Sequence, residues 1–294
     1  MRNTLRLTLA SVAVCSAITF GAATASAAPM TLSQAANDFL LNATVNDSDT
    51  TSGCSVNWTT YEGHTKGACF FVELFKHGNG HASDYASTDI FSIWGKSSPT
   101  SHDFFVMLDS APAPGGPASS PERYFRKITS VTQLVAGDVM VIDSRLAPAL
   151  YAGHMMLVTG PAQLLPSQAS QAGAVGPFWL GTLQWAVPIV DSTASKHGCN
   201  VSYPDSRWSG DCSSGFPVNN GEGVGTGFIR VYTDLTTGQV IGHTWSVSNG
   251  DPNIYYFSQT RRPFRFGRLI SPLPPPQSAP PPPPPPPPNP GAPV

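Results

Sequence analysis

The chain has 294 residues and a formal net charge of -2, and only 12% of its residues are charged. This balance excludes a protein that binds nucleic acid or an acidic polymer through charge alone. Aromatic residues make up 10% of the chain, which is enough to build one well-packed core.

Both ends of the chain are predicted to lie outside the folded domain. Residues 1–27 place Arg2 and Arg6 before an uncharged apolar stretch and end in a small-x-small sequence, which indicates a secretory signal peptide. Residues 271–294 are dominated by proline, which predicts a disordered, extended tail. We therefore expect one domain at residues 28–270, without a transmembrane segment, in a protein that is secreted or located in the periplasm or cell envelope.

Two helices are predicted near the start of this domain. Residues 31–45 carry apolar side chains at helical spacing, which indicates a helix that packs on the core. The polar residues 47–66 predict a loop. Cys69 is expected to open a second helix, because aromatic and aliphatic residues follow it at helical spacing and Gly78 can end the helix.

The next part of the sequence gives weaker signals. Short apolar pieces at residues 90–94 and 104–108 are each expected to form a short helix or strand. Residues 124–134 predict a helix or an extended segment. Prolines between these pieces break any longer pattern.

From residue 138 onward the spacing of apolar residues becomes that of strands. A proline at position 188 predicts an edge strand or a bulge, and residues 233–239 predict a hairpin turn. The expected strands are residues 138–142, 153–160, 185–190, 228–232, 240–245 and 263–270. Helices followed by strands predict an α+β fold, with the N-terminal helices packed on an antiparallel sheet.

Four cysteines remain after removal of the signal peptide, namely Cys54, Cys69, Cys199 and Cys212. They allow three complete pairings. The segment from Cys199 to Cys212 is polar and contains proline and glycine, which suits a loop closed by a disulfide. Cys54 and Cys69 then have two alternatives. If they pair with each other, Cys69 can serve as a nucleophile only if the disulfide is a redox cap. If Cys69 is a free thiol, Cys54 is left as an odd thiol.

Cys69 is a candidate nucleophile, because the start of a helix stabilises a thiolate. A cysteine nucleophile needs a base, and the base needs a third group that orients it. His154 begins one predicted strand and Asp191 ends the next, so neighbouring antiparallel strands would place them side by side. His197 is the alternative orienting residue. The structural alternatives are a buried Cys69 and a buried His154 that serve only the core.

Three short motifs together are similar to the NlpC-type cell-wall peptidases of the papain-like cysteine peptidase superfamily. They are the aromatic-rich helix opened by Cys69, the strand at residues 137–142 and the strand at residues 153–158. The resemblance implies a papain-like fold, with Cys69 as nucleophile, His154 as base and Asp191 as the orienting residue. It further implies a cysteine amidase or endopeptidase that acts on cell-wall peptides such as those of peptidoglycan.

The resemblance also implies an oxyanion site built from the Cys69 backbone N–H and a donor in residues 53–61. The chain departs from the family at Ala68, where an acidic residue is usual, and at Phe70 and Phe71, where a Ser-Gly pair is usual. No cofactor is expected, and the sequence leaves the oligomeric state open.

Two other classes of function remain open at this stage. The first is a catalytically inactive relative that binds envelope peptides, and the second is a structural domain held by a Cys54–Cys69 disulfide. A zinc site at His77 and His81 is disfavoured, because glycines interrupt the helix that would align them. The alternating glycines at positions 221, 223, 225 and 227 predict a flexible lid or a bulge rather than a phosphate-binding loop.

Overall fold

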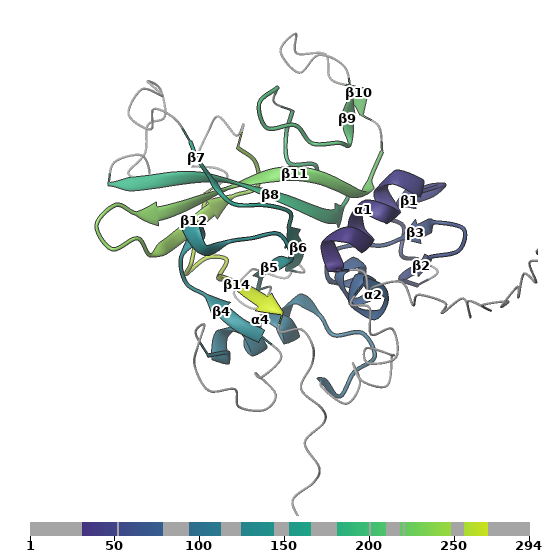
Figure 1. Cartoon of the computed structure of the whole chain (residues 1–294), viewed down its shortest axis with the longest axis horizontal. Coiled ribbons are helices and arrows are strands. Elements are labelled where there is room, and N and C mark those ends of the chain that lie inside the picture. The colour runs from purple at the N-terminus through teal and green to yellow at the C-terminus, as the bar shows by residue number, and fades with distance from the viewer. Residues whose placement is uncertain are drawn as a thin grey trace, which may run out of the picture.

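The computed structural model describes ten segments of the chain, which form an α+β fold of three helices, a large antiparallel sheet and a small mixed sheet (Figure 1). The described residues are 31–51, 53–78, 94–112, 125–143, 153–165, 181–199, 201–209, 218–219, 221–247 and 256–269. The predicted signal peptide, the predicted proline-rich tail and most of the piece at 90–94 lie outside them. Within the described segments, no helix is long and apolar enough to cross a bilayer.

The helices begin where polar side chains can satisfy their first backbone N–H groups. Thr31 caps helix α1 through a capping box with Gln34, and Thr100 caps helix α4 through a capping box with Asp103. The helices are α1 (Leu32–Asn42), α2 (Ala68–Gly78) and α4 (Ser101–Ser110), with a 3-10 turn η2 (Val131–Gln133). Both predicted N-terminal helices are confirmed, and the piece at 104–108 is part of a helix.

The large sheet has the strand order β13-β12-β11-β8-β6-β5-β14-β4, and all of its pairs are antiparallel. A short strand, β7, pairs with β8 beside the end of β6. The strands are β4 (Phe125–Ile128), β5 (Asp138–Ile142), β6 (His154–Val158), β7 (Gln163–Leu164), β8 (Thr182–Thr193), β11 (Gly223–Asp234), β12 (Val240–Thr244), β13 (Tyr256–Ser258) and β14 (Phe264–Leu269). The predicted strands and the predicted hairpin between β11 and β12 are thereby confirmed.

The small mixed sheet lies beside α1 and α2 at one end of the long strands β8 and β11 (Figure 1). It consists of β1 (Val45–Asp47), β3 (Glu62–His64) and β2 (Ser55–Asn57), with β1 parallel and β2 antiparallel to β3. The expected loop at residues 47–66 therefore contains short strands. They are polar and only three residues long, so they carry no alternating pattern. A further two-stranded ribbon joins β9 (Trp208–Ser209) to β10 (Val218–Asn219).

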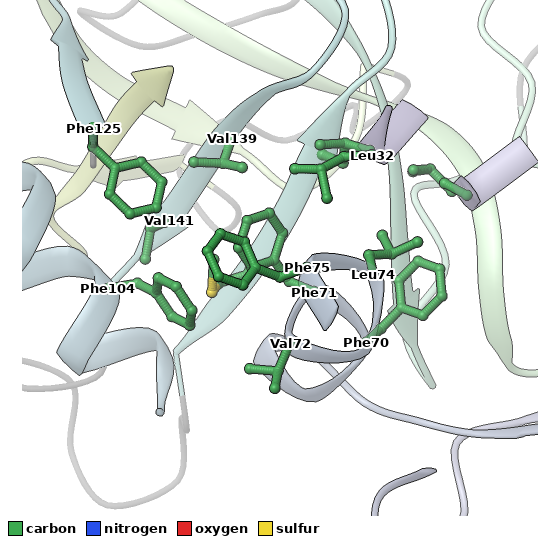
Figure 2. Close-up of a cluster of buried hydrophobic side chains, with 14 of the residues drawn as sticks. Leu32, Phe70, Phe71, Val72, Leu74, Phe75, Phe104, Phe125, Val139 and Val141 are labelled. Carbon is green, nitrogen blue, oxygen red and sulfur yellow. The ribbon is translucent and has the colours of Figure 1, made fainter. Parts of the chain in front are cut away.

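The three helices pack on one face of the large sheet. Alternate residues of β5 divide between two cores: Val139 and Val141 face the helices, while Met140 and Ile142 belong to a second apolar cluster on the other face. Figure 2 shows Phe71 and Phe75 of α2 close to Phe104 of α4 and to the strands, whereas Phe70 lies away from Phe104, beside Leu74. Burial of both faces explains why β5 and β6 are nearly continuous apolar runs.

His243 on β12 lies in the second core without a polar environment. It is completely buried, and its ring contacts Phe257 at 5.5 Å and Phe264 at 4.8 Å between centroids. Neither ring nitrogen has a hydrogen-bond partner among the described residues. Burial, with a smaller contribution from the charge of Arg262, lowers the pKa of His243 to about 3.

Candidate functional site

The structure brings His154 and Asp191 together where the neighbouring strands β6 and β8 carry them. The strands pair Leu157 with Val190, so the start of β6 runs beside the end of β8. His154 Nε2 lies 2.6 Å from Asp191 Oδ2, and both side chains are buried. The predicted proximity of these two residues is confirmed.

The other ring nitrogen of His154 faces the turn that leads into α2. A Cβ atom added to Gly67 would lie 3.4 Å from His154 Nδ1. Gly67 precedes Cys69 by two residues, so the imidazole stands between the Asp191 carboxylate and the start of the Cys69 helix. Nδ1 is therefore the ring nitrogen directed at the turn that precedes Cys69.

Ser192, the residue after Asp191, fixes the same turn. Gly67 N donates to Ser192 O at 2.8 Å, Thr65 Oγ1 donates to Ser192 Oγ at 2.9 Å, and Ser192 Oγ donates to Thr65 O. Strand β8 therefore both carries the Asp191 carboxylate and anchors the chain just before Cys69. No local sequence pattern predicts this role of Ser192.

Cys69 is the second residue of α2, is half-buried and forms a disulfide with Cys54. The two Cα atoms are 6.1 Å apart, which is within the usual range for a disulfide. Cys54 and Cys69 are therefore paired with each other, which is the first of the two alternatives that the sequence left open. Cys199 is also disulfide-bonded, and Cys212 lies outside the described residues.

The residues expected to supply oxyanion donors have other contacts in this structure. The Cys69 backbone N–H donates to Lys66 O at 3.3 Å within the turn, so it is already engaged by a long hydrogen bond. In the loop at residues 53–61, Trp58 stacks on His77 at 3.9 Å between centroids and Tyr61 donates to Asp38. The side chains of Trp58 and Tyr61 thus pack against α2 and α1.

His197 contacts Asp191 and makes no hydrogen bond to His154. Its Nε2 lies 2.9 Å from Asp191 Oδ2, the same oxygen that His154 contacts. Its Nδ1 lies 2.6 Å from Trp245 O, and its ring stacks on the Trp245 ring at 4.4 Å. Of the two residues that were alternatives for orienting His154, Asp191 makes the direct contact and His197 lies behind it.

Arg207 and Asp205 complete a buried cluster of charges around Asp191. Arg207 Nη1 lies 3.0 Å from Asp191 Oδ1, but its hydrogen-bond direction is toward Gly223 O at 3.1 Å, so the contact with Oδ1 is electrostatic. Arg207 Nε and Nη2 each donate to the Asp205 carboxylate at 2.9 Å. The sequence analysis did not identify either residue.

Burial raises the pKa of Asp191, but the charges of His197 and Arg207 and the hydrogen bonds of both imidazoles outweigh burial. Together they hold the pKa of Asp191 well below its usual range. Burial alone would lower the pKa of Arg207, but the Asp191 and Asp205 carboxylates outweigh burial and raise the pKa of Arg207 above its usual value. Asp191 is therefore ionised at neutral pH and can accept hydrogen bonds from both histidines.

Three of the alternating glycines, Gly223, Gly225 and Gly227, belong to strand β11, which pairs with β8 without a bulge there, so the predicted flexible lid or bulge is wrong for them. Gly225 is the register partner of Asp191, and the glycines make room for side chains that lie flat on the strand. A Cβ atom at Gly225 would lie 2.7 Å from Arg207 Nε, and one at Gly227 would lie 3.0 Å from the His197 ring. Glycine at every second position of a strand is the signal that could have located this face.

The remaining site predictions concern metals. His81 lies outside the described residues, and His77 is stacked on Trp58. The part of the chain that the structure describes contains no group of three or more His, Cys, Asp or Glu side chains that could hold a metal ion.

The arrangement provides an imidazole oriented by an ionised carboxylate, next to a helix start whose cysteine is stored in a disulfide. Reduction of that bond would add a thiol to the imidazole and the carboxylate, which are the three groups that nucleophilic cysteine chemistry uses. The chain matches no model of a known protein family, no curated protein and no solved structure.

Proposed function

We propose that this protein is an exported cysteine hydrolase with a papain-like fold of the NlpC type, which cleaves amide bonds in cell-wall peptides. Cys69 is the nucleophile, His154 is the base and Asp191 orients the base. The observation that carries the proposal is the position of His154, with Nε2 on Asp191 at 2.6 Å and Nδ1 toward Gly67 at the start of the Cys69 helix.

The Cys54–Cys69 disulfide makes this activity dependent on a dithiol reductant. A thiolate of the reductant attacks the disulfide and forms a mixed disulfide with one of the cysteines. The second thiol of the reductant resolves the mixed disulfide. At the end of the exchange both cysteines are thiols, and the reductant is oxidised to a disulfide.

In the reduced protein, His154 Nδ1 takes the Cys69 proton and the thiolate attacks the carbonyl carbon of the peptide. The tetrahedral intermediate collapses as His154 returns the proton to the departing amine. Water, activated by the same imidazole, then hydrolyses the thioester and releases the acid. Asp191 keeps the ring oriented and stabilises its charged form in each step.

The test uses the full chain, purified peptidoglycan as substrate and the appearance of new free amino groups as the readout. We expect the wild-type protein to release amino groups only after treatment with dithiothreitol. A Cys54→Ser variant should act without reductant, and the matched Cys69→Ser variant should be inactive under both conditions. Equal activity of the oxidised and reduced wild-type protein would show that Cys69 is not the nucleophile.

Alkylation of Cys69 tests the nucleophile without any assumption about substrate. In the Cys54→Ser background, iodoacetamide near pH 6 should label Cys69 rapidly, because a paired thiolate reacts where an ordinary thiol does not. His154→Gln should slow this labelling by roughly a hundredfold. Labelling that is unchanged in His154→Gln would separate the two residues functionally.

The disulfide itself favours a second candidate function, a stapled module that binds envelope peptides without cleaving them. In that case the oxidised protein should sediment with peptidoglycan, and reduction should yield no new amino groups. Binding by the oxidised wild-type protein together with absence of cleavage by Cys54→Ser would favour this candidate.

A further inference from the structure

We propose that His197 is a positioning residue of this site. At neutral pH it carries protons on both ring nitrogens and holds the Asp191 carboxylate toward His154. His154 stays neutral, and the lone pair of its Nδ1 is directed toward the start of the Cys69 helix. The catalytic consequence rests on the proposed function. The protonation states rest only on the contacts around Asp191.

The partners of His197 require two ring protons. Nδ1 lies 2.6 Å from Trp245 O, a backbone carbonyl that can only accept a hydrogen bond. Nε2 lies 2.9 Å from Asp191 Oδ2, which also only accepts when the carboxylate is ionised. Both nitrogens must therefore donate, and an imidazole that donates twice carries a positive charge.

The charges of the cluster balance only in this arrangement. Asp191 and Asp205 supply two negative charges in a region where every side chain is almost fully buried. Arg207 supplies one positive charge, and the second must come from a histidine. His197 is the histidine that touches both carboxylates, since its backbone N donates to Asp205 Oδ2 at 2.7 Å.

With that charge on His197, His154 is left as the neutral partner. His154 donates to the shared Asp191 oxygen through Nε2. The single proton of the neutral ring is therefore on Nε2, and Nδ1 is unprotonated. This is the tautomer that a base facing Gly67 and Cys69 needs. Trp245 supports both rings, with a stacked contact to His197 and an edge contact to His154 at 4.9 Å.

Nitrogen NMR of the imidazole rings tests the protonation states in the oxidised wild-type protein, where no catalysis is involved. At neutral pH we expect two protonated nitrogens in His197 and one, Nε2, in His154; the His197→Gln spectrum assigns the signals. A bare ring nitrogen in His197 would overturn the proposal.

Alkylation rates in the Cys54→Ser background test the positioning role. We expect His197→Leu to slow iodoacetamide labelling of Cys69 by roughly tenfold or more, because the carboxylate that orients His154 loses its support. His197→Gln, which can still donate one hydrogen bond to Asp191, should recover part of the rate. Circular dichroism identifies any variant that has lost its fold.

The matched control is His102→Gln. His102 is also a histidine paired with an aspartate, at 2.7 Å from Asp143, but it lies on α4 and its partner is not Asp191; its variant should label within about twofold of the parent protein. Equal rates for His197→Leu and its parent would overturn the positioning role. Slow labelling of Cys69 in the parent would contradict the proposed function, while the NMR result for His197 would still stand.

Discussion

The buried His243 predicts a specific acid sensitivity of the fold. Its pKa is lowered to about 3 by burial and, to a lesser extent, by Arg262, whereas an unfolded histidine titrates near 6.5. Because the folded pKa is the lower one, the unfolded state binds the proton first. Stability is therefore unaffected above the unfolded pKa and is lost as the pH falls from about 6.5 toward about 3.

The magnitude follows from the distance between the two pKa values. Each pH unit in that interval costs about 1.4 kcal/mol, so lowering the pH from about 7.5 to about 4.5 should remove about 2.7 kcal/mol through His243 alone. His243→Leu fills the same apolar site without a titrating group. Over the same pH interval, the free energy of unfolding of His243→Leu should decrease less than that of the wild-type protein. The difference between the two decreases should be about 2.7 kcal/mol.

Urea denaturation of both proteins at the two pH values measures this difference, and comparison of the variant with wild type cancels the titration of the other histidines. At the higher pH, His243→Leu should be as stable as wild type or more stable, because no hydrogen bond to the imidazole is lost. If the stability difference between the two proteins is the same at both pH values, His243 does not titrate as the packing requires.

Three further predictions concern packing and capping, each measured by the free energy of unfolding. Thr100→Ala should cost about 1 kcal/mol, because Asp103 N loses its acceptor and the capping box opens; Thr100→Ser should restore most of it. Phe104→Ala should cost about 3 to 5 kcal/mol, since Phe104 is completely buried in the helix-facing core. Gly267→Ala should cost about 1 to 3 kcal/mol, because its Cβ would overlap Leu108. In the double variant Gly267→Ala with Leu108→Ala, the total cost should differ from the sum of the two single costs.

The elements that could be predicted are those with a local pattern. The spacing of apolar residues located β5, β6 and the β11–β12 hairpin, and the order of strands sufficed to bring His154 beside Asp191. The geometry behind Asp191 depends on a loop that returns to the sheet and lies on the glycines of β11. A contact between a loop and a distant strand leaves no periodic signal, so Asp205 and Arg207 were not found.

Pro188 shows how a local rule can mislead. Proline in a strand predicts an edge or a bulge, yet β8 pairs with β11 along its whole length and with β6 and β7 on its other side. Pro188 lies where the neighbour changes from β6 to β7, and Thr159 N donates to its carbonyl there. The missing N–H therefore interrupts no regular ladder, because the ladder is already interrupted at that point.

The two outer strands of the large sheet limit edge-to-edge pairing between copies of the chain. A free strand edge is a template for pairing with another molecule. Here β13 has three residues and β4 has four, against twelve each in β8 and β11. Strand β4 also carries Arg126 and Lys127, and Lys127 N is occupied by Pro112 O. Short, charged and partly covered borders thus oppose edge-to-edge aggregation of the long strands that support the site.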